Sequence, residues 1–403
     1  MEPKIYQVKD HQINPKWIDP DAIFIVEHLR QNGYESYLVG GSVRDLLLGR
    51  RPKDFDISTS ALPEQIKDVF GRRCIIIGRR FRMAHIRIGK KIFEVSTFRA
   101  GDTESSELIL CDNVWGTPEE DVMRRDFTIN GLFYDPHEHT VIDYSGGWED
   151  IQRRLLRTIG VASSRFLQDP VRMIRLLKFQ ARLDFNVDKE AAEALETCKE
   201  SILQSAPARV LEELLRMLES GSAREFFELL ESRGVLELIF PWMMHFLEIP
   251  KGKIVYEYLR HADQVNQSMQ RGPMDRCVLA SCLIYPIFEG EVEKQYTSKG
   301  IVPHLGQVHE LALSLMHGLA TSSFTHFPRR LNTLISYVLT TQYRLTPLSN
   351  RRFNKMKLLR SSDFRFALAF LKLRSYVNPK LSDIYEQWRT LYYQHKEEYG
   401  KTT

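Results

Sequence analysis

The chain has 403 residues and a formal net charge of +4, so it is long enough for two or three domains and permits, without requiring, a nucleic-acid partner. Its five cysteines form no C-x-x-C pair and are odd in number, which argues against a disulfide framework and a structural zinc site. No apolar run reaches membrane-spanning length and the first residues carry no signal-type apolar stretch, so we expect a cytoplasmic protein without a membrane partner.

The first predicted element is a helix that begins near residue 19. Asp19 suits a capping position and Pro20 suits the first helical position. Apolar residues then recur on one face until Gly33, where the helix is expected to end.

Residues 37–59 (YLVGGSVRDLLLGRRPKDFDIST) predict a strand, a Gly-Gly turn, a helix over Ser42–Leu48, a basic loop and a second strand. The second strand is expected to carry Asp54 and Asp56. Because side chains alternate along a strand, both acids should face one way while Phe55 points into the core. Two carboxylates side by side on a rigid strand can hold a pair of divalent cations, an arrangement that serves polymerase chemistry.

An isolated Asp-x-Asp carries little weight, because such pairs recur by chance in a chain with 52 acidic residues. The surrounding sequence is more specific. Gly40 and Gly41 close the first strand, so backbone amides and the start of the following helix could cradle phosphates. Arg44 and the basic run 50–53 lie between that turn and the acids. The alternative is a strand-turn-helix-strand with a solvated basic loop.

The segment Gly40–Asp45 (GGSVRD), followed by Asp54 and Asp56, resembles the signature of the class II template-independent nucleotidyltransferases. These comprise the bacterial poly(A) polymerases and the CCA-adding enzymes of tRNA. The resemblance implies that Asp54 and Asp56 are catalytic and hold Mg²⁺ or Mn²⁺, with ATP as substrate. It also implies nucleotide binding by the turn and the helix after it, through Gly40, Gly41, Arg44 and Asp45.

The rest of the first 150 residues predicts a small sheet with helices against it. A helix is expected over Leu62–Phe70 and strands over Cys74–Ile77, Met83–Ile88 and Ile92–Phe98. Segment 101–108 is polar and predicts a mobile loop. A hairpin should follow over 133–144; its turn holds an aspartate and two histidines, which we interpret as a polar turn in preference to a metal cluster.

Two further acids are candidates for a third active-site carboxylate. Glu94 belongs to a strand that could neighbour the Asp-x-Asp strand; the alternative is an outward-facing glutamate. Asp126 lies in the segment 124–130 (RRDFTIN), which matches the family motif R-R-D-F-T-x-N. Arginine forks bind phosphate bidentately, and an aspartate can accept from ribose hydroxyls. The segment's expected nucleotide-binding residues are Arg124, Arg125 and Asn130; its alternative reading is a helix-capping acid with a basic flank.

Segment 168–175 (QDPVRMIR) predicts a helix with Asp169 as its cap and Pro170 in its first turn, which places Arg172 and Arg175 on one face. It resembles the family motif E-D-x-x-R, in which the Asp and the Arg read the incoming base, so the resemblance assigns Asp169, Arg172 and Arg175 to nucleotide binding. Asp and Arg together suit adenine or cytosine. Gln168 stands where the family has Glu, which removes a charge beside the base reader.

From Gly147 onward helical periodicity replaces strand patterns through to about residue 398. An amphipathic helix over Pro207–Leu218 resembles the neck helix of the family; a plain core helix is the alternative. Near the C-terminus a density of basic residues could follow a phosphate backbone. The residues expected to bind RNA are Arg351, Arg352, Lys355 and Lys357, with Arg360, Arg365, Lys372 and Arg374 on the same basic stretch. The interleaved phenylalanines fit a core.

The sequence therefore predicts an α/β nucleotidyltransferase head over residues 1–148, a helical neck over 149–240 that reads the nucleobase, and a helical body with a basic RNA-binding region over 241–403. The predicted reaction is addition of AMP from ATP to RNA 3′ ends. Segments 77–88 and 112–121 and the basic tail favour poly(A) synthesis over CCA addition. A non-catalytic RNA-binding protein on the same fold is the remaining alternative.

Overall fold

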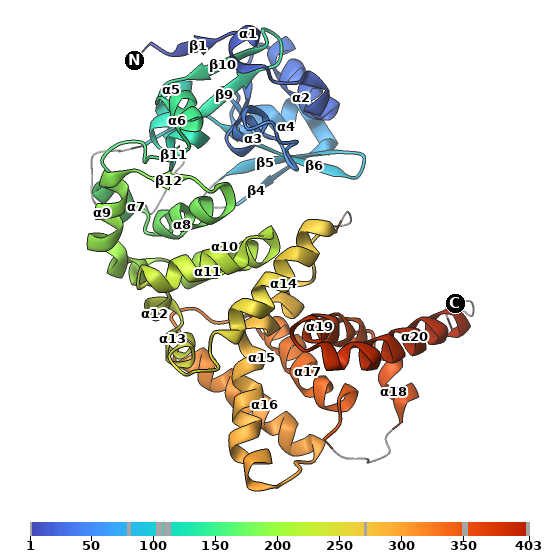
Figure 1. The fold of residues 1–403 in the computed structure, drawn as a ribbon. Coiled ribbons are helices and arrows are strands. Elements are labelled where there is room, and N and C mark those ends of the chain that lie inside the picture. The colour runs from blue at the N-terminus through green and yellow to red at the C-terminus, as the bar shows by residue number, and fades with distance from the viewer. Residues whose placement is uncertain are drawn as a thin grey trace. The chain divides into compact units, whose positions relative to one another are not determined.

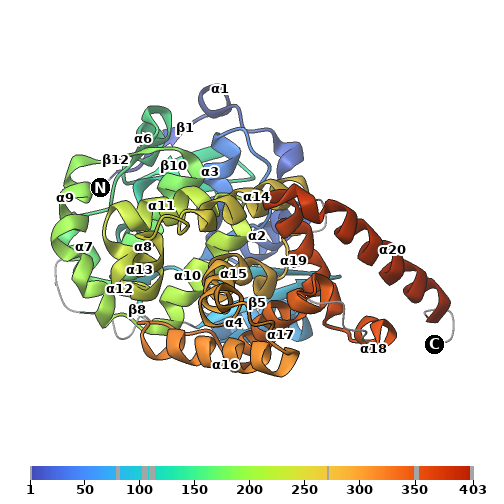
Figure 2. The same cartoon turned by 60° about the horizontal axis from the view of Figure 1, so that its bottom comes forward.

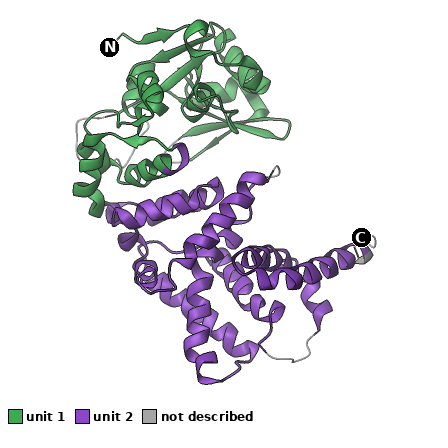
Figure 3. Ribbon diagram, viewed as in Figure 1, with its two compact units in different colours: residues 1–180, 184–201 green, residues 181–183, 202–403 purple. Residues whose placement is uncertain are grey.

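The computed structural model describes residues 2–78, 82–101, 108, 114–269, 272–348 and 354–399. Two compact units divide the chain (Figure 3): residues 1–180 with 184–201 form unit 1, and residues 181–183 with 202–403 form unit 2. The division into head, neck and body at residues 148 and 240 stays a prediction. The loop predicted at 101–108 lies almost wholly outside the described residues.

Unit 1 is built on a mixed sheet (Figure 1). Among the described residues this sheet has eight strands in the order β1-β10-β9-β2-β3-β6-β5-β4, and only β3 and β6 are parallel neighbours. Their bounds are β1 Lys4–Tyr6, β2 Ser36–Val39, β3 Asp56–Thr59, β4 Cys74–Ile77, β5 Met83–Ile88, β6 Lys91–Thr97, β9 Leu132–Asp135 and β10 Thr140–Asp143. The predicted strands and the hairpin β9–β10 are confirmed.

The prediction that Asp54 and Asp56 share a strand is wrong for Asp54. Strand β3 begins at Asp56, which pairs with Val39, the last residue of β2. The chain turns away at Gly40, so the residues before Asp56 have no continuation of β2 to pair with. The predicted alternation nevertheless holds, because Phe55 is buried while both acids are exposed.

Helices cover the sheet of unit 1. Helix α2 (Pro20–Gln31) begins as predicted, with Asp19 Oδ1 accepting from the Asp21 N–H at 3.0 Å. Helix α4 (Pro63–Phe70) lies beside it through a contact between the rings of His28 and Phe70. On the face that holds Val39 and Phe133, an apolar cluster includes Val122 of α5 (Pro118–Met123). The remaining unit 1 elements are α1 Val8–His11, α3 Gly41–Leu47, β7 Arg99–Ala100, β8 Val114–Trp115, α6 Gly147–Arg153, β11 Leu155–Leu156, α7 Ala162–Gln168, β12 Asn186–Val187 and α9 Lys189–Cys198; α8 Val171–Leu183 ends in unit 2.

Unit 2 is helical wherever the structure describes it, as predicted. Helix α15 (Arg276–Gln295) is its centre (Figures 1 and 2): it packs against five other helices and is buried along most of its length. The other helices are α10 Pro207–Ser220, α11 Ala223–Ser232, α12 Val235–Ile239, α13 Pro241–Leu247, α14 Ile254–Ser268, α16 Leu305–Thr321, α17 Arg329–Leu345, α18 Lys355–Leu359, α19 Phe364–Val377 and α20 Ser382–Tyr399. No helix in the described part of the chain is both long enough and apolar enough to cross a bilayer.

One residue of the predicted basic surface is part of the core. Arg374 is 8% exposed, and its guanidinium lies 4.6 Å from the Tyr285 ring and donates to Thr346 Oγ1. The helical spacing that buries Phe366 and Phe370 carries Arg374 to the same side of α19. Its assignment to an RNA-facing surface is therefore wrong. The assignment of the interleaved phenylalanines to the core is confirmed for Phe364, Phe366 and Phe370, while Phe353 lies outside the described residues.

Candidate active site

The two acids lie at the end of the sheet that also holds the glycine turn. Asp56 is opposite Val39 in the antiparallel pair β2–β3, so it is next to Gly40. Gly40 has φ +69°, and a Cβ placed there would lie 3.3 Å from Nη1 of Arg125. Only glycine adopts this backbone easily. The turn thus brings the start of α3, an exposed carboxylate and a guanidinium into one region.

Glu94 shares a sheet face with Asp56. Ile57 of β3 pairs in parallel with Val95 of β6. Asp56 and Glu94 come one residue earlier on these strands, so both project from the sheet face opposite to the side chains of Ile57 and Val95. The expectation that the strand of Glu94 neighbours the strand that carries Asp56 is confirmed. The Glu94 side chain is 54% exposed, and its carboxylate lies 3.7 Å from Nε2 of His85 on β5.

Arg125 reaches the same face from the loop after α5. It donates to Ser58 Oγ at 3.1 Å, two residues beyond Asp56 on β3, and to Asp121 Oδ2 at 2.7 Å. Its guanidinium also lies 5.6 Å from the Phe133 ring. The sequence motif did not identify Asp121 as its partner, although the spacing of four residues within one helical turn was a usable signal.

A chain of hydrogen bonds connects α3 to α8 through the 126–130 segment. Arg44 donates to Asp45 Oδ1 at 2.7 Å and to Asn130 Oδ1 at 2.6 Å. Asn130 in turn donates to Asp126 Oδ1 at 3.0 Å, and Arg175 donates to Asp126 Oδ2 at 2.7 Å. Five predicted site residues are therefore members of one network.

Asp126 is buried and ionised within this network. Burial opposes its ionisation, but the charge of Arg175 and hydrogen bonds from Asn130, Arg175 and the Phe127 N–H outweigh it, so its pKa lies well below the usual range. Both carboxylate oxygens accept hydrogen bonds from these groups. In this arrangement Asp126 holds Arg175 in place, whereas Asp54 and Asp56 present exposed carboxylates.

The predicted base-reading segment begins differently from expected. Asp169 ends α7, the capping position of α8 is taken by Pro170, and no side chain caps α8. The prediction of Asp169 as cap is wrong, because α7 and α8 follow each other so closely that Asp169 belongs to the end of α7. Arg172 and Arg175 do share a face: Arg172 Nη2 donates to the Arg124 carbonyl at 2.9 Å, as Arg175 donates to Asp126.

Arg165 is a residue that the sequence motifs missed. It is fully buried, and its Nη2 donates to the carbonyls of Met123 and Arg125, while Nη1 donates to Gln168 Oε1 at 2.5 Å. Burial, with repulsion from Arg172 and Arg124, lowers its pKa to about 9. The residue that replaces the family's Glu, Gln168, is thus an acceptor for a buried cation.

Phe179 was likewise not expected. Three cations surround its ring at 5.1 to 5.5 Å: Arg44, Lys178 and Arg175. Cations over an aromatic face gain electrostatic stabilisation. No sequence motif singled out Phe179, and its cationic neighbours come from α3 as well as α8.

The predicted RNA-binding residues lie on α18 or before it. Arg351 and Arg352 are outside the described residues. Lys355 and Lys357 are exposed on α18, and Nζ of Lys355 lies 5.5 Å from the Trp388 ring. Their role stays a prediction.

The exposed pair Asp54 and Asp56 fits a site for Mg²⁺ or Mn²⁺. Among the described residues no group of three or more His, Cys, Asp or Glu side chains could hold a metal. Mg²⁺ is commonly bound through one or two carboxylates together with substrate phosphates, and carboxylate oxygen is the donor that it and Mn²⁺ prefer. The donor set therefore suits an ion that arrives with a nucleotide.

Three family models match the chain. They describe a poly A polymerase head domain over residues 36–157, a probable RNA and SrmB-binding site of polymerase A over 184–247, and a polymerase A arginine-rich C-terminus over 316–403. The first contains every predicted residue of the glycine turn, the acids and the 124–130 segment.

Curated relatives and solved structures agree with these matches. The chain is 35% identical over 399 residues to poly(A) polymerase I of Salmonella typhi, covering 94% of this chain and 84% of that protein. It is 34% identical over 235 residues to a CCA-adding enzyme of Staphylococcus aureus, covering 57% and 56%. Its fold is similar to the Bacillus stearothermophilus CCA-adding enzyme in complex with CTP, with a TM-score of 0.61 at 24% identity over 94% of this chain and 83% of that one. The chain therefore belongs to the nucleotidyltransferase family that contains the bacterial poly(A) polymerases I and, as further relatives, the CCA-adding enzymes.

Proposed function

We propose that this chain transfers AMP from ATP to RNA 3′ ends, as a poly(A) polymerase. The observation that carries the proposal is the register of β2 and β3, which places Asp56 beside the Gly40 turn on the face that Arg125 reaches. Membership of the family supplies the reaction class, nucleotidyl transfer.

In the proposed reaction the RNA 3′-hydroxyl attacks the α-phosphorus of ATP. A new phosphodiester bond forms, the bond between the α-phosphorus and the bridging oxygen breaks, pyrophosphate leaves with that oxygen, and the proton of the hydroxyl passes to solvent. Asp54 and Asp56 would hold the metal ions, which when bound lower the pKa of the hydroxyl and neutralise the leaving group. Glu94 lies on the same face as Asp56 and is the third acid that we favour there.

The remaining site residues would orient the nucleotide. Arg125, fixed by Asp121 and Ser58 through Nε and Nη2, points Nη1 toward the glycine turn, where it could donate to a phosphate oxygen. Asp126 we assign to positioning, since its oxygens hold Arg175 and Asn130. Asp169 and Arg172 would read adenine by accepting from its amino group and donating to its ring nitrogen.

Poly(A) synthesis is favoured over CCA addition by the extent of the likeness. Sequence similarity to poly(A) polymerase I of Salmonella typhi spans 94% of the chain, whereas sequence similarity to the CCA-adding enzyme of Staphylococcus aureus spans 57%. RNA and ATP are accordingly the proposed substrates, and the cytoplasm is the proposed compartment.

Product length on a denaturing gel tests the proposal. The purified chain receives Mg²⁺, a generic RNA or a tRNA lacking its 3′ CCA, and ATP with or without CTP. Long ladders from ATP alone on the generic RNA are expected. Growth that stops after three nucleotides on tRNA and needs CTP would identify a CCA-adding enzyme instead.

A variant with Asp54→Ala and Asp56→Ala controls the chemistry. It is expected to lose extension by at least about a thousandfold while still binding RNA, because metal-assisted charge stabilisation is worth several kcal/mol. Wild-type protein that binds RNA but extends it under no metal or nucleotide would show that the fold serves binding only.

A further inference from the structure

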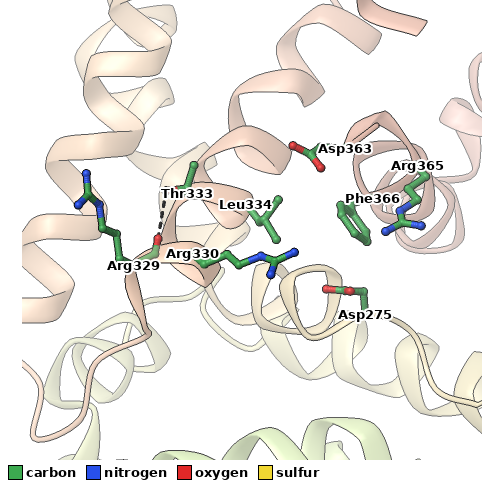
Figure 4. Close-up of a pocket in the computed structure, with 8 residues that line it drawn as sticks. All are labelled: Asp275, Arg329, Arg330, Thr333, Leu334, Asp363, Arg365 and Phe366. Atoms are coloured by element: carbon green, nitrogen blue, oxygen red, sulfur yellow. Dashed lines mark hydrogen bonds between the residues drawn. The ribbon is translucent and has the colours of Figure 1, made fainter. Parts of the chain in front are cut away.

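A hollow of about 720 Å³ in unit 2 lies far in sequence from the site described above (Figure 4). It is formed where three long helices begin: α15 after Asp275, α17 at Arg329 and α19 after Asp363. These helices pack against one another, so their N-terminal ends are held in fixed proximity. The lining residues are Asp275, Arg329, Arg330, Thr333, Leu334, Asp363, Arg365 and Phe366.

The arginines of the hollow are exposed and make no ion pair with any described residue. Arg330 reaches toward the middle of the hollow, and Arg365 lies beside Phe366, with its guanidinium 4.5 Å from that ring (Figure 4). Arg329 extends in the other direction (Figure 4). Two exposed guanidinium groups that line one cavity can bind an anion there.

The helix ends add to this positive potential. Helix α17 has 17 residues and no side-chain cap, and α19 has 14 residues and none either. The first N–H groups of such helices lack intrahelical acceptors and carry the positive end of the helix dipole. These ends reinforce the arginines but would not define a site without them.

Two carboxylates line the same hollow without pairing with its arginines. Asp275 is engaged as the cap of α15, where it accepts from the Cys277 N–H at 2.9 Å. Asp363 lies at the capping position of α19, and its Oδ1 accepts from Ser362 Oγ at 3.4 Å. Cations and acids that face one cavity at more than ion-pair distance leave space for a ligand with both negative groups and donors. A ribonucleotide unit has both, a phosphate and a 2′-hydroxyl.

We propose that this hollow binds the backbone of single-stranded RNA, with Arg330 and Arg365 on phosphate oxygens and Asp363 accepting from a ribose hydroxyl. The choice of RNA over a free phosphate compound rests on the proposed function. The hollow opens to solvent through the exposed Arg329, Arg330 and Thr333, so a strand can enter and leave it. The apolar floor at Leu334 and Phe366 would cover the sugar.

Binding of fluorescent (A)20 to the full chain, followed by anisotropy from 50 to 300 mM salt, tests the site. The variant Arg330→Gln/Arg365→Gln is expected to bind about tenfold more weakly at low salt. The slope of log affinity against log salt should fall by about 1.4, since each lost phosphate contact on a single strand removes about 0.7. Both arginines are exposed and unpaired, so the variant should melt as the wild type does.

The matched control is Lys299→Gln/Lys380→Gln, which removes the same charge from two exposed positions of unit 2 outside the hollow. A control that weakens RNA binding as much as the arginine variant would overturn the proposal, because general charge alone would explain the loss. ATP and inorganic phosphate are titrated in parallel. Arginine-dependent binding of either, with RNA affinity unchanged, would also overturn it and reveal a small-anion site.

The experiments distinguish an error in the proposed RNA site of the hollow from an error in the proposed function. AMP addition to a saturating RNA does not require the hollow, so the arginine variant should keep its kcat while its KM for (A)20 rises. A wild type that binds (A)20 through these arginines but adds no AMP would refute the polymerase and leave the binding site intact.

Discussion

At the scale of single residues, Gly40 is a position of the site where an added side chain would be costly for two reasons. Its φ of +69° and ψ of −128° belong to a backbone region that only glycine occupies readily, and the guanidinium of Arg125 lies directly outside it. A Cβ at residue 40 would be in tight contact with Arg125, whose side chain would have to shift by a few tenths of an ångström.

We expect Gly40→Ala to lower the free energy of unfolding by about 1–3 kcal/mol, the usual cost of such a backbone strain. It should also reduce kcat/KM for ATP by about tenfold or more, since Arg125 must shift from its position. Gly33→Ala is the matched control: Gly33 also has positive φ, at +85°, but a Cβ there meets nothing within 4 Å. Equal kinetic losses in both variants would contradict the role given to Arg125.

Gln168 is the second informative residue. It accepts from Nη1 of the buried Arg165, which holds two carbonyls of the 123–125 segment. A carboxylate at residue 168, as in the family motif, would turn this bond from a cation to a neutral acceptor into an ion pair.

We expect Gln168→Glu to keep activity and to raise stability by about 1 kcal/mol, because the buried Arg165 cation would then have an anionic partner. Gln168→Leu should cost about 1–3 kcal/mol, because it removes an acceptor from a buried cation. Urea unfolding with steady-state kinetics on both variants checks this. A Leu variant as stable as the wild type would show that Arg165 does not depend on residue 168.

At the scale of elements, local patterns in the sequence were sufficient where one helix or strand decides the structure. Asp19 caps α2, and the burial of Phe55 between two exposed acids follows from strand alternation. Local patterns failed where two elements share a residue or where the end of one element decides the start of another. Asp169 ends α7 and so cannot cap α8, and β3 begins only at Asp56 because its partner β2 stops at Val39.

Contacts between site residues that lie far apart in the chain also could not be predicted from the sequence. Arg165 bonds to a carbonyl 40 residues away, and the cations around Phe179 come from α3 and α8. Composition predicted a basic C-terminal surface, but it could not show that packing turns Arg374 inward while Arg330, on a different helix, faces a hollow.

The junction of α11 and α14 contains a buried acid that makes stability depend on pH. Asp263 of α14 accepts from the backbone N–H groups of Ala223 and Arg224 at the start of α11. Burial raises its pKa to about 6, although these two hydrogen bonds oppose the shift. Because the folded pKa exceeds the unfolded one, near 3.9, the folded state is favoured at low pH, and this contribution is lost as pH rises through 6.

We therefore expect the free energy of unfolding of unit 2 to fall by up to about 3 kcal/mol between pH 4 and pH 7, at 1.36 kcal/mol per pKa unit. Asp263→Asn, which has no proton to lose, should remove this slope. The control Glu237→Gln changes an exposed acid of the same unit and should keep the slope. Chemical unfolding at several pH values measures this slope of the free energy of unfolding against pH. An unchanged slope in Asp263→Asn would show that another group causes the pH dependence.

At the scale of the whole molecule, the two units divide the proposed tasks. The residues proposed to hold ATP and the metal ions, from Gly40 to Arg175, all lie in unit 1, whereas Arg330 and Arg365 lie in unit 2. Each unit has about 200 residues and an apolar cluster of its own. A unit of this size can unfold as a cooperative whole.

Calorimetry should accordingly resolve two unfolding transitions, and each ligand should move one of them. ATP with Mg²⁺ at about 100 times its Kd should stabilise unit 1 by about 2.7 kcal/mol, which corresponds to a rise in Tm of roughly 5–10 °C for a domain of this size. The unit 2 transition is recognised by its shift between pH 5 and 7, which Asp263→Asn removes, and low-salt (A)20 should raise it. In Asp54→Ala/Asp56→Ala the ATP-induced shift should shrink while the (A)20 shift remains. A single transition moved equally by both ligands would mean that the units unfold together and that binding in one stabilises the other.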